Sequence, residues 1–191
     1  MAEEGDMMLR ALVRDLVQVP GVEVVITRDA RLGDPGLPVI THMVWSAGDL
    51  ARCWARCVQE VEWVWPIAPE TDGILEYLSG AVLDAGRGLL NSRPEAVRVA
   101  ASKVDTAACL KAAGLPAIET WRADALPLLD GGGWVLKPER GVGCQEARLF
   151  CDRAALAAAI ADKEQGAGAW AVQPFTPGRP PACPCWWQTT R

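Results

Sequence analysis

A lysine close to a run of glycines is the first feature of this sequence that could do chemistry. Lys137 ends an apolar stretch that begins at Trp134, and Gly141 and Gly143 follow it. Glycine N–H groups can approach phosphate oxygens closely because no Cβ intervenes, and a lysine on the adjacent strand adds a compact positive charge. The segment can therefore hold a polyphosphate, although the same pattern is also typical of an ordinary hairpin with an exposed lysine.

Two well-known phosphate-binding motifs do not occur in the sequence. A P-loop needs GxxxxGK[ST] at the start of a helix, and a dinucleotide-binding loop needs GxGxxG between a strand and a helix. The sequence contains neither pattern. A dinucleotide-dependent oxidoreductase is therefore disfavoured.

Three motifs in a fixed order favour the phosphate site over the ordinary hairpin, because together they resemble the first half of the ATP-grasp fold. The first motif contains Ser102, Lys103 and Thr106 and closes with Gly-Leu-Pro at 114–116. The second is Val-Leu-Lys-Pro at 135–138 with its glycine loop, and the third is Val-Gln-Pro-Phe at 172–175 followed by Gly178. This order favours a nucleotide site over the hairpin alternative.

The resemblance implies a role for each matching residue. The two lysines bind the phosphates of ATP, the loop glycines form a lid over them, and the glutamine and the backbone of the phenylalanine contact adenine. Two cations suit a polyphosphate, and a side-chain amide can both donate to and accept from an adenine edge. The expected ATP-binding residues are Lys103, Lys137, Gly141, Gly143, Gln173 and Phe175.

A narrower resemblance concerns the segment 65–75. Its Ala-Pro-Glu sequence, which ends at Glu70, resembles a motif of the ATP-grasp subgroup that contains tyramine-glutamate ligases of methanofuran-type cofactor synthesis. The resemblance makes Glu70 a candidate substrate-site residue. The alternative is that Glu70 is a helix-start carboxylate, which the helix dipole favours.

The family implies an ATP-dependent carboxylate-amine ligase that activates its acid as an acyl phosphate and uses ATP and Mg²⁺. In that family the magnesium ligands lie in a second lobe, beyond the third motif, so we expect none of them here and no activity from this chain alone. No catalytic residue is therefore assigned. The alternative function is a non-catalytic module that binds a nucleotide or a partner.

Both ends of the chain depart from the family's pattern. The family's leading domain opens with a strand, whereas residues 4–19 predict a helix, and residues 179–191 are rich in Pro, Cys and Trp without strand alternation. Because Trp has a single codon, reading residues 185–188 from the third base of each codon gives Leu-Val-Ala followed by Asn or Asp. We therefore expect a chain truncated at both ends, with a frameshifted tail.

The pattern of apolar residues predicts an α/β fold with a boundary near Ser92 and an irregular tail at 179–191. The resemblance implies that residues 1–91 are a Rossmann-like pre-ATP-grasp domain and that residues 92–178 are the α+β N-terminal lobe of an ATP-grasp domain. In the first domain alternating strands and helices predict a parallel sheet covered on both faces. The expected strands are 22–27, 39–45, 61–67, 117–121, 134–138, 147–150 and 169–175. The expected helices are 4–19, 49–59, one capped by Thr71, one opened by a capping box at Ser92 and interrupted near Ser102, and 152–162.

Composition bounds the remaining possibilities. The net charge of -5 gives no electrostatic reason to expect nucleic acid, and no apolar run reaches the length of a membrane span, so we expect a cytoplasmic protein with small-molecule carboxylate and amine substrates. The seven cysteines are scattered and odd in number, which argues against a disulfide framework. Cys53 and Cys57 lie one helical turn apart, but His42 is the only histidine, so a metal-thiolate site is disfavoured. Oligomeric state is left open.

Overall fold

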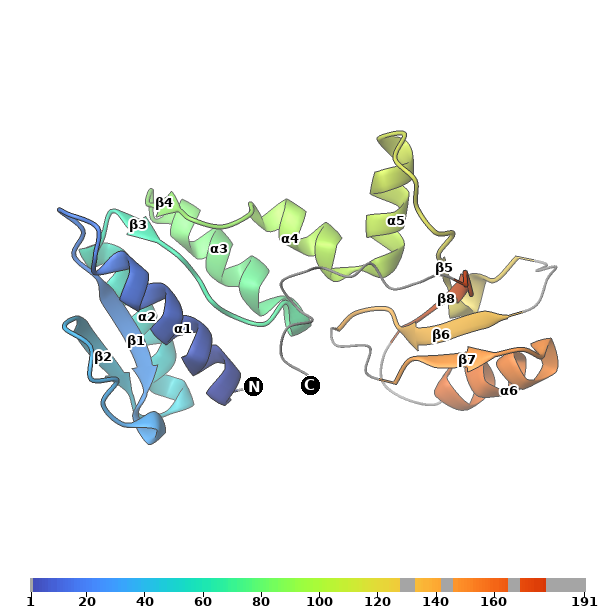
Figure 1. The fold of residues 1–191 in the computed structure, drawn as a ribbon, viewed down its shortest axis with the longest axis horizontal. Coiled ribbons are helices and arrows are strands. Elements are labelled where there is room, and N and C mark those ends of the chain that lie inside the picture. The colour runs from blue at the N-terminus through green and yellow to red at the C-terminus, as the bar shows by residue number, and fades with distance from the viewer. Residues whose placement is uncertain (1, 128–132, 142–145, 165–168, 178–191) are drawn as a thin grey trace, which may run out of the picture. The chain divides into compact units, whose positions relative to one another are not determined.

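The computed structural model describes residues 2–127, 133–141, 146–164 and 169–177. It divides into two compact units, Met1–Ala101 and Ser102–Arg191 (Figure 1). The boundary predicted near Ser92 lies just before helix α4 (Pro94–Ala101), whereas the division between the units falls after Ala101, between α4 and helix α5 (Lys103–Ala112). The predicted lid residue Gly143 and the tail 179–191 lie outside the described residues. No helix in the described part of the chain is long and apolar enough to cross a membrane.

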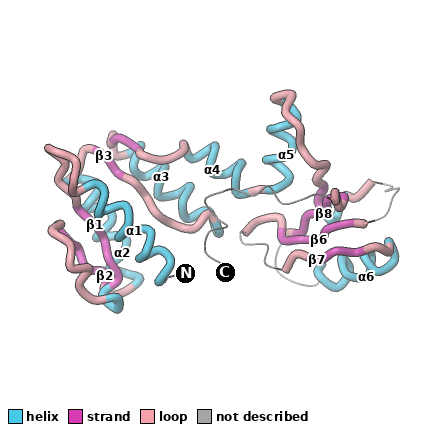
Figure 2. The backbone as a smooth tube through the Cα atoms, in the orientation of Figure 1, coloured by secondary structure: helices cyan, strands magenta, loops and turns pink. Residues whose placement is uncertain are grey.

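The first unit alternates helices with short strands, as predicted (Figure 2). Its elements are α1 (Ala2–Leu16), β1 (Val25–Asp29), η1 (Ala30–Leu32), β2 (Ile40–Val44), α2 (Ala47–Glu60), β3 (Trp63–Val64), η2 (Thr71–Gly73), α3 (Ile74–Asp84), β4 (Gly88–Leu89) and α4 (Pro94–Ala101). Strand β1 pairs in parallel with β2, and β3 pairs in parallel with β4. The predicted parallel pairing is therefore confirmed.

The prediction of one continuous sheet in this unit is wrong for the described residues, which form two separate two-stranded sheets. The strand expected over residues 61–67 is reduced to Trp63–Val64. Pro66 follows closely, and proline cannot donate a hydrogen bond to a strand ladder. The strand therefore ends early, and it pairs only with β4.

Helix starts in the first unit follow local capping chemistry. Ser46 precedes α2, and its hydroxyl accepts a hydrogen bond of 3.2 Å from the N–H of Asp49. The predicted cap of α3 at Thr71 is wrong, because a 3₁₀ turn intervenes and Gly73, with φ of 68°, precedes the helix. Asp72 also has a positive φ of 57°. Two consecutive left-handed residues redirect the chain, so α3 begins at Ile74 instead.

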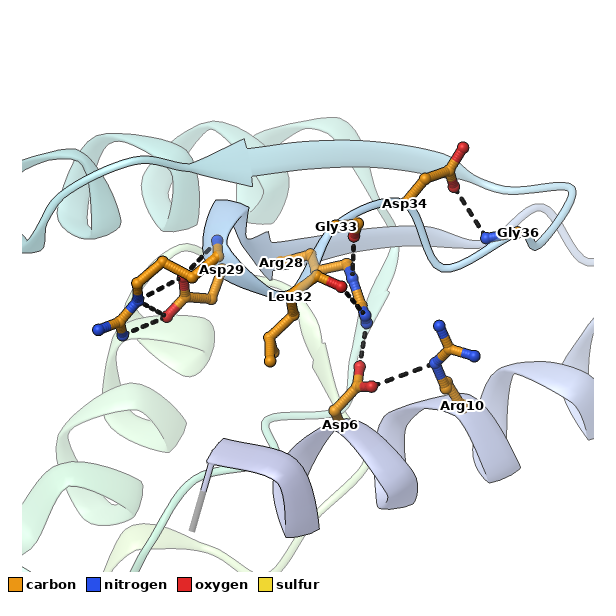
Figure 3. A network of polar contacts seen from close by, with 9 residues as sticks. Asp6, Arg10, Arg28, Asp29, Leu32, Gly33, Asp34 and Gly36 are labelled. Atoms are coloured by element: carbon orange, nitrogen blue, oxygen red, sulfur yellow. Dashed lines mark hydrogen bonds and ion pairs between the residues drawn. The ribbon is translucent and has the colours of Figure 1, made fainter.

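A buried arginine secures the end of β1 and the loop after it (Figure 3). Arg28 donates from Nε to the carbonyl of Gly33 at 2.7 Å and from Nη2 to the carbonyl of Leu32 at 3.1 Å. Its Nη1 forms an ion pair with Asp6 of α1, which also pairs with Arg10. Because a buried guanidinium needs partners for its N–H groups, this network fixes the loop to the helix.

The second unit is an antiparallel sheet with one helix packed on it, which matches the predicted α+β lobe (Figure 1). Its strands lie in the order β5-β8-β6-β7. The elements are α5 (Lys103–Ala112), β5 (Trp121–Arg122), η3 (Ala123–Ala125), β6 (Trp134–Pro138), β7 (Arg148–Phe150), α6 (Arg153–Glu164) and β8 (Trp170–Pro174).

Alternation along β6 and β8 separates a core face from an opposite face. Trp134, Leu136 and Val172 pack against Leu156 and Ile160 of α6 in one buried cluster. Burial of each large apolar side chain stabilises the fold by about 2 kcal/mol. Because successive side chains of a strand point to opposite faces, the residues between them must face away from α6.

Candidate functional site

Strands β6 and β8 carry two of the predicted ATP-binding residues on one face. In their antiparallel register Val135 pairs with Gln173, and Lys137 pairs with Ala171. Directly paired residues share a face, so Lys137 and Gln173 both lie on the face opposite α6. The sheet thereby brings the second and third sequence motifs together.

The start of α5 brings Lys103 to the segment that follows Lys137. The ammonium of Lys103 donates to the carbonyl of Gly141 at 3.0 Å and, more weakly, to that of Glu139 at 3.4 Å. The Lys103 backbone N–H also donates to the Glu139 carbonyl at 3.2 Å. Segments more than thirty residues apart in the sequence therefore meet at one place, and the charge of Lys103 lies against Gly141.

Glu139 is a residue of this site that sequence reasoning missed. Its side chain is only 7% exposed, and its carboxylate accepts hydrogen bonds from the hydroxyl of Ser102 and, at 3.4 Å, from the N–H of Val104. Arg140 completes its surroundings with an ion pair of 3.6 Å. A glutamate after a Lys-Pro pair gives no sequence signal of burial, because glutamates are almost never buried unless paired.

Ser102 links this carboxylate to the helix. Its hydroxyl oxygen accepts from the N–H of Asp105 at 3.0 Å, as a helix cap does, while its O–H donates to Glu139. The predicted break near Ser102 is confirmed, because Ser102 has an extended backbone between α4 and α5. Because its hydroxyl both donates and accepts a hydrogen bond, Ser102 links the start of α5 to the end of β6.

Glycine is required by the backbone at both ends of the β6 segment. Gly141 has φ of 107° and Gly133 has φ of 117°, a region that other residues rarely adopt. The remaining predicted lid residue, Gly143, is outside the described part of the chain. Among the described residues, Gly141 is therefore the predicted lid residue that lies beside Lys103.

The predicted adenine-contacting residues lie at the end of β8. The amide of Gln173 donates to the hydroxyl oxygen of Thr120 at 2.7 Å, and that hydroxyl donates to the carbonyl of Ile118 at 3.0 Å. Phe175 is 44% exposed, and its N–H donates to the carbonyl of Gly133 at 2.9 Å. The Phe175 N–H is thus already paired.

A shallow hollow adjoins these residues. It has a volume of about 390 Å³. Its walls come from the extended segment after α5 and from the end of β8, and the lining residues are Pro116, Ala117, Ile118, Glu119, Pro174 and Thr176. The two residues that line it from the end of β8, Pro174 and Thr176, alternate along the chain with Gln173 and Phe175.

The other candidates lie in the first unit. Glu70 is exposed at the start of η2 and makes no side-chain cap there. His42 pairs with Glu60 at 3.0 Å, and Cys53 contacts the carbonyl of Met43. Among the described residues, no group of three or more His, Cys, Asp or Glu side chains could hold a metal ion.

The comparisons with known proteins agree with this architecture. Residues 22–97 match the model of the pre ATP-grasp 3 domain. No curated protein matches the sequence significantly.

Solved structures resemble both units. The biotin carboxylase domain of 2-oxoglutarate carboxylase from Hydrogenobacter thermophilus has 16% identity and a TM-score of 0.63, over 87% of this chain and 42% of its own. The L-amino acid ligase from Bacillus licheniformis has 17% identity and a TM-score of 0.57, over 87% and 41%. D-alanine–D-alanine ligase from Bacillus anthracis, complexed with ATP, has 12% identity and a TM-score of 0.53, over 73% and 48%.

This chain spans less than half the length of these solved proteins, at 42%, 41% and 48%. At such low identity the likeness shows the fold, and the matched domain model agrees with it. The chain has an α/β fold in which residues 22–97 match the pre-ATP-grasp domain, and its fold resembles that of these ligases and of the biotin carboxylase domain.

Proposed function

We propose that the second unit binds ATP between the start of α5, the end of β6 and the end of β8. The observation that carries this proposal is the hydrogen bond of 3.0 Å from the Lys103 ammonium to the Gly141 carbonyl. It brings together two motifs whose order in the sequence resembles that of an ATP-grasp lobe. Lys103 and Lys137 would neutralise phosphate oxygens. The Lys103 ammonium would then exchange its hydrogen bonds to backbone carbonyls for stronger ones to the charged phosphate.

The adenine would lie beside the end of β8. Gln173 is held by Thr120 at 2.7 Å, which fixes the plane of its amide. A fixed amide can distinguish the donor and acceptor pattern of adenine from that of guanine.

The described residues fit a nucleotide but not its metal. Lysine ammonium groups and glycine N–H groups suit phosphate oxygens, whereas Mg²⁺ prefers several oxygen ligands, and the described residues contain no carboxylate group of that kind. ATP, when bound, supplies the phosphoryl group that activates a carboxylate. The residues of this chain bind and orient the nucleotide, and we derive no step through the metal.

We further propose that the whole protein is an ATP-dependent carboxylate-amine ligase acting through an acyl phosphate. Two of the similar structures are named as ligases of amino acids, which supports this reaction class. The Ala-Pro-Glu segment that ends at Glu70 supports the narrower proposal of a tyramine-glutamate ligase-like enzyme. Glu70 is exposed, as a residue that contacts substrate must be.

ATP binding can be measured by the tryptophan fluorescence of the chain and by calorimetry. We expect Lys103→Met and Lys137→Met each to weaken ATP binding about tenfold while adenosine binding changes little, because each removes a phosphate partner. Lys163→Met, which removes a lysine of α6 paired with Glu146, is the matched control, because α6 covers the opposite face of the sheet. Equal loss of ATP and adenosine affinity in the two lysine variants would contradict the proposed site.

The ligase proposal needs a separate measurement. Hydroxylamine traps acyl phosphates as hydroxamates, so the chain is joined to the second lobe that the family places beyond the third motif and incubated with ATP, Mg²⁺ and a panel of carboxylic acids that includes glutamate. A ligase produces hydroxamate and ADP in equal amounts. ATP binding without hydroxamate from any acid would instead support a non-catalytic nucleotide-binding module.

A further inference from the structure

We infer that Glu139 is a positioning residue for Lys103, and this inference rests on the proposed ATP site. Glu139 follows the end of β6, whereas Lys103 is the first residue of α5. The carboxylate contacts the residues on either side of Lys103, at Ser102 and Val104. In this proposal Glu139 does not contact the nucleotide itself.

The burial of Glu139 is costly, so its partners must offset the cost. A carboxylate that leaves water loses several kcal/mol unless hydrogen bonds or charges replace its hydration. The side chain of Glu139 is 7% exposed, and it accepts a hydrogen bond from the Ser102 hydroxyl. The Val104 N–H at 3.4 Å and Arg140 at 3.6 Å are longer contacts. An apolar residue at this position would avoid the cost, which argues for a geometric role of the charge.

Hydrogen bonds from the start of α5 reach both the side chain and the backbone of Glu139. The Glu139 side chain accepts from Ser102 and Val104, and the Glu139 backbone carbonyl accepts from the backbone N–H of Lys103 at 3.2 Å. The Glu139 N–H is also held, by the carbonyl of Ala169 at 2.9 Å. The backbone of Lys103 is therefore fixed to the sheet.

Fixing the lysine backbone matters because its side chain is long. Fixing a lysine side chain on a phosphate costs up to about 2 kcal/mol of rotamer entropy, and the cost is larger if the start of the helix is frayed, because the backbone must be fixed as well. With the backbone fixed, the ammonium reaches the Gly141 carbonyl at 3.0 Å and so stays close to the proposed phosphate position. Preorganisation of this kind increases affinity by reducing the entropy lost on binding.

Three variants separate the contributions of charge, shape and the helix cap. Glu139→Ala removes the carboxylate, Glu139→Gln keeps an acceptor for Ser102 without the charge, and Ser102→Ala removes the hydroxyl. Asp124→Asn is the matched control, because it makes the same carboxylate-to-amide change in the exposed ion pair with Arg122.

The first measurement compares the affinities for ATP and adenosine. We expect Glu139→Ala to weaken ATP binding about tenfold and adenosine binding less than about twofold, with Glu139→Gln between Glu139→Ala and the original chain. A merely structural role would lower both affinities together, so equal losses would overturn the inference. An unchanged ATP affinity in Glu139→Ala would overturn it as well.

The second measurement does not depend on ATP. Lysines are reductively methylated with ¹³C-formaldehyde, and the Lys103 resonance is assigned with Lys103→Arg. We expect this resonance to move in Glu139→Ala and Ser102→Ala while that of Lys163 stays in place. If the original chain binds no ATP, the proposed function fails, and this readout alone decides the inference. A Lys103 resonance that does not move in either variant would overturn it.

Discussion

The N–H of Phe175 donates to the carbonyl of Gly133 at 2.9 Å, and a Cβ added to Gly133 would lie 3.2 Å from the Cβ of Phe175. The chain after β8 thus passes directly over the glycine that opens β6. This close approach holds the proposed adenine segment on the sheet. Gly133 meets two requirements at once, because its φ of 117° is also unfavourable for other residues.

Gly133→Ala should destabilise the second unit by about 2 kcal/mol, since it adds both backbone strain and a tight contact. Thermal unfolding followed by far-UV circular dichroism measures the loss. Gly48→Ala is the control, because Gly48 lies in helix α2 with only one atom within 4 Å of an added Cβ, at 3.8 Å. Alanine favours helices there, so an equal loss in both variants would contradict the role given to Gly133.

Gln173→Ala should weaken ATP binding about tenfold and reduce the preference for ATP over GTP, because the amide that Thr120 orients is removed. Competition between the two nucleotides in a fluorescence titration measures the preference. Gln59→Ala, which changes an exposed glutamine at the end of α2, should leave both affinities unchanged. An unaltered ATP-to-GTP ratio in Gln173→Ala would show that adenine is recognised elsewhere.

Regular patterns made much of the fold predictable from sequence. The strand predicted at residues 134–138 is confirmed as β6, and the strand expected over 169–175 is observed as Trp170–Pro174. Apolar alternation in such strands records which face is buried, so the placement of Lys137 opposite the core follows from sequence as well. The break at Ser102 also follows from a local rule, helix capping.

Other features depend on contacts between distant residues, which a single sequence does not reveal. Nothing local distinguishes Glu139 from an exposed glutamate, since its partners lie near residue 102. Arg28 is similar, because its burial depends on Asp6 and on loop carbonyls. The roles predicted for Lys103, Lys137 and Gln173 come from motif order and stay predictions until binding is measured.

The ion pair of Asp6 with buried Arg28 should make the first unit sensitive to acid (Figure 3). The hydrogen bond from Arg28, aided by the charges of Arg28 and Arg10, holds the pKa of Asp6 below its usual value. An unfolded aspartate has a pKa of about 3.9, so this stabilisation is fully present above that pH. It is lost as the pH falls through the lower pKa of the folded state.

Asp6→Asn should therefore lower the stability of the first unit by about 2 kcal/mol at neutral pH, and the difference should shrink in acid. Urea unfolding at several pH values between 2 and 7 measures this dependence. Asp15→Asn, on the exposed side of the same helix, should change stability little. A difference from the original chain that persists unchanged at the lowest pH would contradict the ion-pair explanation.

The described cysteines should differ sharply in reactivity. Burial, with smaller contributions from Glu60 and Cys53, raises the pKa of the Cys57 thiol, and only the thiolate reacts readily with alkylating agents. Cys109 and Cys151 are exposed, and Cys53 is half-buried.

We expect iodoacetamide at pH 7.5 to modify Cys109 and Cys151 first, Cys53 later, and Cys57 only after urea unfolds the first unit, as followed by peptide mass spectrometry. Cys53→Ser is the control for helix α2, because it should leave Cys57 protected. Rapid modification of Cys57 in the folded chain would mean that α2 does not pack as described, since access and a raised pKa both oppose that reaction.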